Sequence, residues 1–271
     1  MKMRPAVVVV AVLATLGCGT APREPQTLSY EQFRAAAYQE PDTGVFITNG
    51  DELAETEDDL AEAYGRYVAG LEAPVQVPDG VMPLIVNVVN GKDDRWAAAT
   101  ATNITYCISS KSFGSRYSAV VTAMNSATAT WEATANVNFV HLSTLDGSCS
   151  ATTAGVVFDV RLVNTSQYLA RAFFPSTSRR SRNILISSSS FGTITPYTLA
   201  GVLRHELGHT IGFRHEHTRP ESGTCFEDSS WRALTAYDAS SVMHYPQCNG
   251  ANTGDLVLTS LDKTGARALY P

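Results

Sequence analysis

Three histidines and a glycine in the C-terminal third of the chain constrain its structure most strongly. They lie in the run His-Glu-Leu-Gly-His-Thr-Ile-Gly-Phe-Arg-His, residues 205–215. His205 and His209 are four residues apart in a segment with a helical pattern, so both imidazoles lie on one face, one turn apart. Gly212 can adopt a positive φ, end the helix and turn the chain so that His215 reaches the same metal. Three protein ligands and one open position are what a catalytic zinc ion requires.

Glu206 follows the first histidine and would lie close to a metal-bound water without being a ligand. Zn²⁺ lowers the pKa of such a water to about 7, and the carboxylate can take its proton as the water attacks a carbonyl. An amphipathic helix with incidental histidines is the alternative, but the further glycine and histidine at fixed offsets make coincidence rare. The pattern therefore predicts a zinc-dependent hydrolase of peptide bonds.

A second motif, Ser-Val-Met-His-Tyr-Pro, follows at residues 241–246. Together with the zinc run it resembles the metzincin clan of zinc endopeptidases, in which a methionine turn forms an apolar floor beneath the metal. The resemblance gives this role to Met243. The Met-His-Tyr form is similar to the astacin branch, which implies that Tyr245 is a switchable zinc ligand or stabilises the oxyanion. A tyrosine that simply packs beside the site is the alternative.

The sequence from the third histidine onward, His-Glu-His-Thr-Arg-Pro, is similar to that of the dual-action HEIGH metallopeptidase family. The resemblance covers roughly residues 83–271. Patterns of β-branched and apolar residues predict an α+β fold. Strands are expected at residues 84–89, 103–108, 137–142, 155–163 and 183–188, and helices at 115–134, 198–211 and 261–269. The resemblance implies a metzincin-type catalytic domain. Such a domain has a twisted mixed sheet, a backing helix, a zinc-binding helix, and a C-terminal subdomain with the methionine turn and a terminal helix.

A weaker strand is expected at residues 169–174, ending before Pro175. By analogy with metzincins it is the sheet edge to which an extended peptide substrate is added as a further strand. This analogy makes four residues candidates for substrate binding, namely Ala170, Arg171, Ala172 and Phe173.

Residues 30–80 read as an N-terminal segment separate from a catalytic domain at 81–271. The segment is expected to contain a helix at 30–38, an extended stretch at 45–48 with an Asn-Gly turn, and an acidic helix at 52–68, before a linker at 73–80. Astacin-type zymogens are silenced by an aspartate in a Phe-x-Gly-Asp motif. The similar run Phe-Ile-Thr-Asn-Gly-Asp has two extra residues and makes Asp51 a candidate zinc ligand in place of water. An ordinary Asn-Gly-Asp turn is the alternative.

The first 18 residues have a basic start and an apolar stretch too short to span a bilayer, which is typical of an export signal. Leu-Gly-Cys at its end resembles a bacterial lipobox, with Thr15 where leucine is usual, so Cys18 is a candidate for lipidation. A plain signal peptide is the alternative. Residues 19–29 read as a tether. We expect an exported protein, either lipid-anchored in the cell envelope through Cys18 or extracellular.

The other four cysteines are even in number, which favours disulfides in an exported protein. Pairing Cys107 with Cys149 and Cys225 with Cys248 closes two local loops and is the connectivity we expect. Cys-x-x-Cys spacing, which would indicate a cysteine-rich metal site, does not occur.

Composition sets the remaining limits. The chain of 271 residues is 44% hydrophobic and 17% charged, enough for a buried core, and its net charge of −6 argues against a nucleic-acid partner. We expect a monomer that acts on peptide or protein substrates. The alternative function is a catalytically silent surface adhesin built on the same fold, which the presence of Glu206 disfavours.

Overall fold

The computed structural model describes residues 27–72, 84–251 and 254–271. The predicted export signal with Cys18, most of the tether and the linker at 73–80 lie outside these ranges. Within them, no helix is long and apolar enough to cross a membrane.

A five-stranded sheet forms the centre of the molecule, in the order β7-β6-β8-β10-β9. Its strands are β6 (Ile104–Ile108), β7 (Phe139–His141), β8 (Phe158–Val163), β9 (Ala170–Arg171) and β10 (Asn183–Ser187). The strands β7, β6, β8 and β10 run parallel to one another, and the edge strand β9 pairs antiparallel with β10. A mixed sheet combined with several helices confirms the predicted α+β class.

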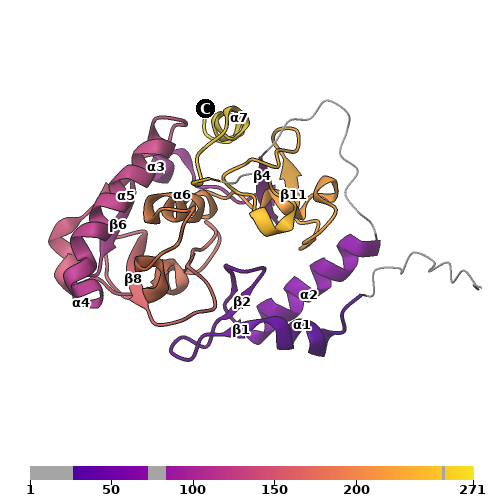
Figure 1. Cartoon of the computed structure of the whole chain (residues 1–271), viewed down its shortest axis with the longest axis horizontal. Coiled ribbons are helices and arrows are strands. Elements are labelled where there is room, and N and C mark those ends of the chain that lie inside the picture. The colour runs from indigo at the N-terminus through magenta and orange to yellow at the C-terminus, as the bar shows by residue number, and fades with distance from the viewer. Residues whose placement is uncertain (1–26, 73–83, 252–253) are drawn as a thin grey trace, which may run out of the picture.

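Two long helices pack against each other and share the main hydrophobic core with this sheet. They are α5 (Tyr117–Glu132) and α6 (Leu199–Thr210), which lie beside β6 in Figure 1. Trp131 joins them, because its indole N–H donates to the carbonyl oxygen of Arg204 at 2.9 Å. Thr198 caps α6 by accepting a hydrogen bond from the amide of Gly201.

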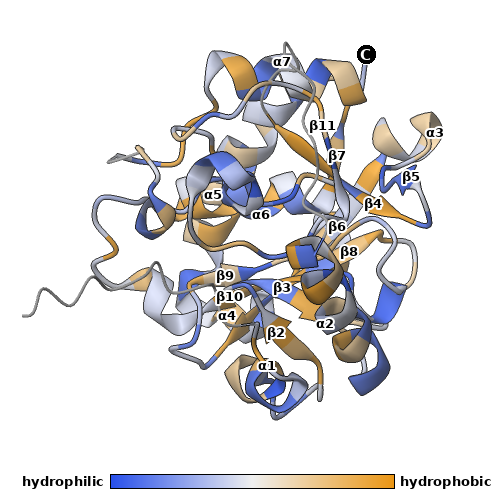
Figure 2. Ribbon diagram, turned by 90° about the vertical axis from the view of Figure 1, so that its right-hand side faces the viewer, coloured by the Kyte–Doolittle hydropathy of each residue, from blue (hydrophilic) through white to orange (hydrophobic). Residues whose placement is uncertain are grey.

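The chain after α6 continues into a second, three-stranded sheet in the order β11-β4-β5. This sheet contains β4 (Ile85–Val89), β5 (Lys92–Asp93) and β11 (Trp231–Ala233). The orange of hydrophobic residues marks β4 in Figure 2. Gly212, at φ +100°, connects α6 to this sheet, and its carbonyl oxygen accepts a hydrogen bond from the amide of Asn87. A Cβ at Gly212 would lie 2.1 Å from the carbonyl oxygen of Asp94, so the turn requires glycine.

A terminal helix, α7 (Ser260–Leu269), completes the C-terminal part, and a capping box between Thr259 and Asp262 starts it. The remaining short elements are α3 (Ala98–Ala101), α4 (Ser110–Phe113) and the 3-10 turns η1 (Gly114–Arg116), η2 (Ser143–Ser148), η3 (Arg179–Ser181), η4 (Ser188–Phe191), η5 (Glu216–Thr218), η6 (Pro220–Ser222) and η7 (Pro246–Cys248).

Both disulfides of the structure have the expected pairing. Cys107–Cys149 joins the end of β6 to the end of η2, and Cys225–Cys248 joins the loop after the third histidine to η7. Each therefore fixes a loop to an element close to the centre of the fold.

The N-terminal segment lies beneath the two sheets in Figure 1. It comprises α1 (Tyr30–Ala36), β1 (Tyr38–Gln39), β2 (Phe46–Thr48), β3 (Glu52–Ala54) and α2 (Glu57–Glu72). The three strands form an antiparallel sheet in which Thr48 pairs with Glu52, so that residues 49–51 form the tip of a hairpin.

Two elements differ from the sequence-based predictions. The acidic helix covers Glu57–Glu72 rather than residues 52–68, so it also continues four residues beyond its predicted end. It begins later because residues 52–54 pair with β2 across the Asn-Gly turn and Thr56 caps the helix through Asp59. The edge strand covers only Ala170–Arg171 instead of residues 169–174, because the chain then turns away and Phe174 bonds Thr177. The other predicted elements end within three residues of the observed bounds.

Candidate metal centre

Three imidazoles face one point between α6 and the hairpin tip. His205 and His209 come from α6, and the turn at Gly212 brings His215 to them. Each ring is held by its Nδ1 atom. Nδ1 of His205 bonds the Val242 carbonyl at 2.7 Å, and that of His209 bonds the Phe213 carbonyl at 2.8 Å.

A carbonyl oxygen can only accept, so these two Nδ1 atoms carry the proton and the Nε2 atoms are left with lone pairs. The two Nε2 atoms are 3.3 Å apart. Nδ1 of His215 is 2.6 Å from the carboxylate of Glu227, which fixes the third ring in the same sense. The rings of His205 and His209 therefore present lone pairs to a common point, and Nε2 of His215 faces the same point.

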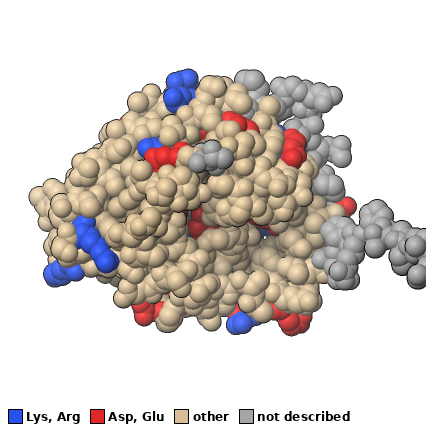
Figure 3. Space-filling model, in the orientation of Figure 1, with Lys and Arg blue, Asp and Glu red and all other residues tan. Residues whose placement is uncertain are grey.

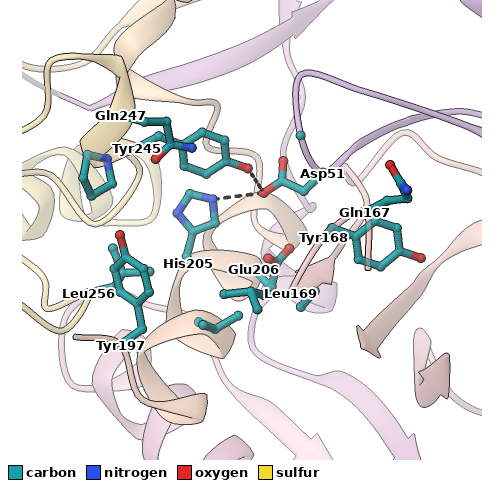
Figure 4. Close-up of a pocket in the computed structure, with 14 residues that line it drawn as sticks. Asp51, Gln167, Tyr168, Leu169, Tyr197, His205, Glu206, Tyr245, Gln247 and Leu256 are labelled. Atoms are coloured by element: carbon teal, nitrogen blue, oxygen red, sulfur yellow. Dashed lines mark hydrogen bonds and ion pairs between the residues drawn. The ribbon is translucent and has the colours of Figure 1, made fainter. Parts of the chain in front are cut away.

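Asp51, at the hairpin tip, brings a carboxylate to the same point. Its oxygens lie 3.3 Å from Nε2 of His205, 3.7 Å from Nε2 of His209 and 3.1 Å from Nε2 of His215. Figure 4 shows the carboxylate between Tyr245 and His205. Neither Oδ1 of Asp51 nor Nε2 of His215 has a hydrogen bond, although both are buried. Three ring nitrogens and a carboxylate form a donor set that suits a zinc ion.

Burial and mutual charge set the electrostatics of the centre. Burial lowers the pKa of His205 to about 4, so this ring is in the neutral form that binds metals. For Asp51, burial would raise the pKa, but the neighbouring histidines outweigh it and hold the pKa well below its usual range. Burial, followed by the charge of Asp51, raises the pKa of Glu206 well above its usual range.

Glu206 lies beside the metal-ligand candidates and not among them. Its side chain is buried and its Oε2 atom has no hydrogen-bond partner. It lines a cavity of about 220 Å³ together with Asp51, His205 and Tyr245 (Figure 4). A carboxylate with a free oxygen that faces such a cavity can accept a proton from a water or a substrate there.

Tyr245 covers the histidines from the C-terminal part of the chain. Its ring lies 4.5 Å from that of His215 and 5.5 Å from that of His205, and its hydroxyl donates to Oδ2 of Asp51 at 2.5 Å. This contact requires the hairpin to come very close. Gly50 permits it, because a Cβ there would lie 2.9 Å from the Tyr245 hydroxyl oxygen.

Met243 is fully buried against α6. A Cβ at Gly208 would lie 2.4 Å from its sulfur and 3.2 Å from the ring of Trp131. Gly208 stands between His205 and His209 on the helix, so Met243 lies beneath the helical turn that presents these two candidate ligands.

Gly208→Ala is expected to destabilise the protein by about 1–3 kcal/mol, because the added methyl group overpacks the contact with Met243. Thermal unfolding of the full chain measures the effect. Gly65→Ala, in the open middle of α2, is the matched control and is expected to be stabilising, because alanine is the better helix former. Equal changes in both variants would show that the Met243 contact can relax freely.

Four charged residues missed by the sequence analysis surround the third histidine. The Arg214 guanidinium donates to Asp228 at 2.6 Å, to Glu227 at 3.1 Å and to Glu52 of the hairpin at 3.1 Å. Oε1 of Glu227 in turn accepts a hydrogen bond from Nδ1 of His215 at 2.6 Å and lies 3.2 Å from Nε2 of His217. Arg214 inside the zinc run was the available signal, since a buried arginine requires acidic partners.

Glu227→Gln is expected to weaken zinc binding about 10–100-fold, because a carboxylate behind a ligating histidine fixes the ring and raises its basicity. Competition with a coloured zinc chelator measures the affinity. Glu62→Gln, an exposed residue of α2, serves as the control. An unchanged affinity in Glu227→Gln would remove Glu227 from the metal centre.

The four residues expected to bind substrate along the edge strand lie in three different surroundings. Ala170 lines the cavity that contains Glu206. The side chain of Arg171 is buried against the N-terminal segment, whereas Ala172 and Phe173 pack into the main core.

Comparison with known proteins gives a family match and several partial likenesses. Over 81 residues the chain is 30% identical to Protein SpAN of Strongylocentrotus purpuratus. The matched stretch is 23% of this chain and only 13% of that relative. Myroilysin is similar in structure, with a TM-score of 0.48, 18% identity and coverage of 69% of this chain and 98% of its own. High choriolytic enzyme 1, a hatching enzyme zinc-protease of the medaka Oryzias latipes, is also similar in structure, with a TM-score of 0.41 and 21% sequence identity. The likeness covers 65% of this chain and 94% of that one.

The family model described as dual-action HEIGH metallo-peptidase matches residues 94–270, which include all three histidines, Glu206, Met243 and Tyr245. This match covers well over half of the chain and agrees with the resemblance seen in the sequence. The chain belongs to the dual-action HEIGH metallo-peptidase family.

Proposed function

We propose that the protein is a zinc-dependent endopeptidase in which His205, His209 and His215 hold the metal and Glu206 is the general base. The observation that carries this proposal is the convergence of the three Nε2 atoms, each fixed from behind through Nδ1. Asp51 is the fourth donor within 4.8 Å. Histidine nitrogens and one replaceable oxygen ligand are the arrangement expected of a catalytic zinc.

When bound, zinc supplies Lewis acidity that polarises a peptide carbonyl and makes a water acidic near neutral pH. Glu206 accepts the proton of the attacking water on its free Oε2 atom and later returns it to the amine leaving group. The Tyr245 hydroxyl already donates to a negatively charged oxygen, that of Asp51. The same donor is therefore suited to stabilise the oxyanion that develops on the substrate carbonyl.

We propose that residues 30–80 keep the enzyme latent. The hairpin tip puts Asp51 beside the three histidines and lies between two cavities, the one of about 220 Å³ and a second of about 830 Å³ lined by Glu52 and Arg214. Figure 3 shows a hollow near the centre of this face with acidic atoms in its depth. A peptide substrate cannot pass from one cavity to the other while the hairpin tip lies between them, so release of the segment would open the cleft.

Export of the protein is part of the proposal. Two disulfides favour folding in an oxidising compartment rather than in the cytosol. Lipidation at Cys18 stays a prediction, which a Cys18→Ser variant tests through loss of membrane association in a detergent-partition assay.

The decisive test measures casein hydrolysis before and after the segment is released. The full chain is folded with zinc, and a protease site placed between residues 72 and 84 is then cut. Hydrolysis is expected after release, should stop with an excess of zinc chelator and should return when zinc is added back. Hydrolysis that survives the chelator would contradict a zinc mechanism. A zinc-loaded, released protein that cleaves no casein would favour the silent adhesin instead.

A further inference from the structure

The side chain of Glu40, in the N-terminal segment, is bound by a cradle of three residues, Tyr168, Arg171 and Asn183. Nε and Nη2 of Arg171 each donate to one oxygen of Glu40 at 2.8 Å. The Tyr168 hydroxyl also donates to this carboxylate, at 2.5 Å. Asn183 holds the arginine from behind, since its Oδ1 accepts from Nη1 of Arg171 at 2.6 Å. This two-pronged geometry is well suited to a carboxylate.

Arg171 depends on the segment for its charge partner. Its side chain is 1% exposed, and among the described residues Glu40 is the only carboxylate within ion-pair distance. Arg214 differs, because it keeps Glu227 and Asp228 when Glu52 leaves. Release of the segment therefore leaves Arg171 with neutral partners, Asn183 and Tyr168, and exposes a cationic fork beside the cleft. A fork in this state favours an anionic ligand.

The cradle lies next to the metal centre. Tyr168 and the neighbouring Ala170 line the same cavity as Glu206. Val45 and Ile47 of the segment pack against Tyr168 and Leu185, which would become an apolar wall of the opened cleft.

We propose that Tyr168, Arg171 and Asn183 form a substrate subsite for an acidic side chain, which Glu40 occupies in the latent protein. The substrate class is a peptide with a glutamate, or a similar carboxylate, followed or preceded by apolar residues that contact Tyr168 and Leu185. This inference rests on the proposed function, because the subsite becomes available when the segment leaves.

The cradle is tested first in the full chain by replacing the lost side chain with a small molecule. Glu40→Ala removes the atoms that acetate can replace, so acetate is expected to raise the melting temperature of the zinc-loaded variant by about 2–4 °C more than that of the native chain. Acetamide, which is neutral, should have no such effect. The double variant Glu40→Ala with Arg171→Met should not respond. Equal responses of native and variant chains, or an equal response to acetamide, would overturn the cradle as a carboxylate site.

The second test measures specificity in the enzyme released from the folded full chain. Peptide pairs that differ by one Glu/Gln exchange at successive positions around the cleaved bond are compared. At one position the glutamate peptide is expected to be favoured about 10–100-fold in kcat/KM, mainly through KM. This ratio should fall towards one in Arg171→Met and persist in Arg180→Met, an exposed arginine of η3.

Failure of the subsite and failure of the proposed function give different results in the two tests. No position with a glutamate preference in an active enzyme, or a preference that survives Arg171→Met, would refute the subsite. If the released protein cleaves no peptide at all, the proposed function fails, and the acetate response still decides whether the cradle binds carboxylates.

Discussion

The Glu206→Gln variant, released from its N-terminal segment, is expected to cleave casein about 10²–10⁴-fold more slowly than the native enzyme. Glutamine has nearly the same shape as glutamate but cannot accept a proton at neutral pH. The side chain is absent from the cluster of converging donors, so zinc content should stay the same. A loss of rate with full zinc occupancy therefore isolates proton transfer from metal binding.

Initial rates with a fluorescent casein and zinc content by mass spectrometry are the two measurements. Glu221→Gln, an exposed residue of the same half of the chain, is the matched control and should change neither quantity. A rate reduced by only a few-fold would mean that another group takes the proton. A loss of zinc in Glu206→Gln would mean that the carboxylate supports the ligands, and its role as base would need separate evidence.

The parts of the site that lie close together in the sequence were predictable. His205, Glu206 and His209 share one helix, and Gly212 needs a positive φ whatever the rest of the fold does. The position of His215 then follows from a turn of three residues. Local spacing and one backbone requirement thus carry the essential geometry of the metal centre.

Contacts between distant segments could not be predicted. Glu40 is 131 residues from Arg171, and Glu52 is 162 residues from Arg214, with no local pattern that would join them. The start of the acidic helix was wrong for a related reason. Glu52, Leu53 and Ala54 are adequate helix formers, but pairing with β2 across the hairpin outweighs this local preference.

The charged network around Arg214 links the segment to the metal centre without making the centre depend on it. Glu52 adds a third carboxylate to an arginine that already holds Glu227 and Asp228. Loss of Glu52 leaves Glu227 in place, so His215 keeps the partner that orients its ring. Under the proposed latency, the network would bind the segment through Glu52 and still hold the ring of His215 in place after the segment leaves.

Asp51→Ala in the full chain is expected to raise casein hydrolysis by at least about tenfold over the native full chain. The variant removes the carboxylate that lies within 3.1–3.7 Å of the three histidines and receives the Tyr245 hydroxyl. A charge-assisted interaction contributes about 1.5–3 kcal/mol, so its loss shifts the ratio of closed to open protein by about 10–100-fold. Asp51→Asn should lie in between, because the amide fills the same space but binds a metal weakly.

Asp58→Ala is the matched control, since this residue is exposed on α2 and should leave the full chain latent. The rate of each variant is compared with that of the same variant after its segment is released, which separates better opening from altered chemistry. If Asp51→Ala stays latent while release still activates it, the segment inhibits by covering the cleft and Asp51 is dispensable. If release activates neither protein, residues 30–80 are part of the working enzyme, and their buried contacts with Arg171 and Arg214 serve its stability rather than its latency.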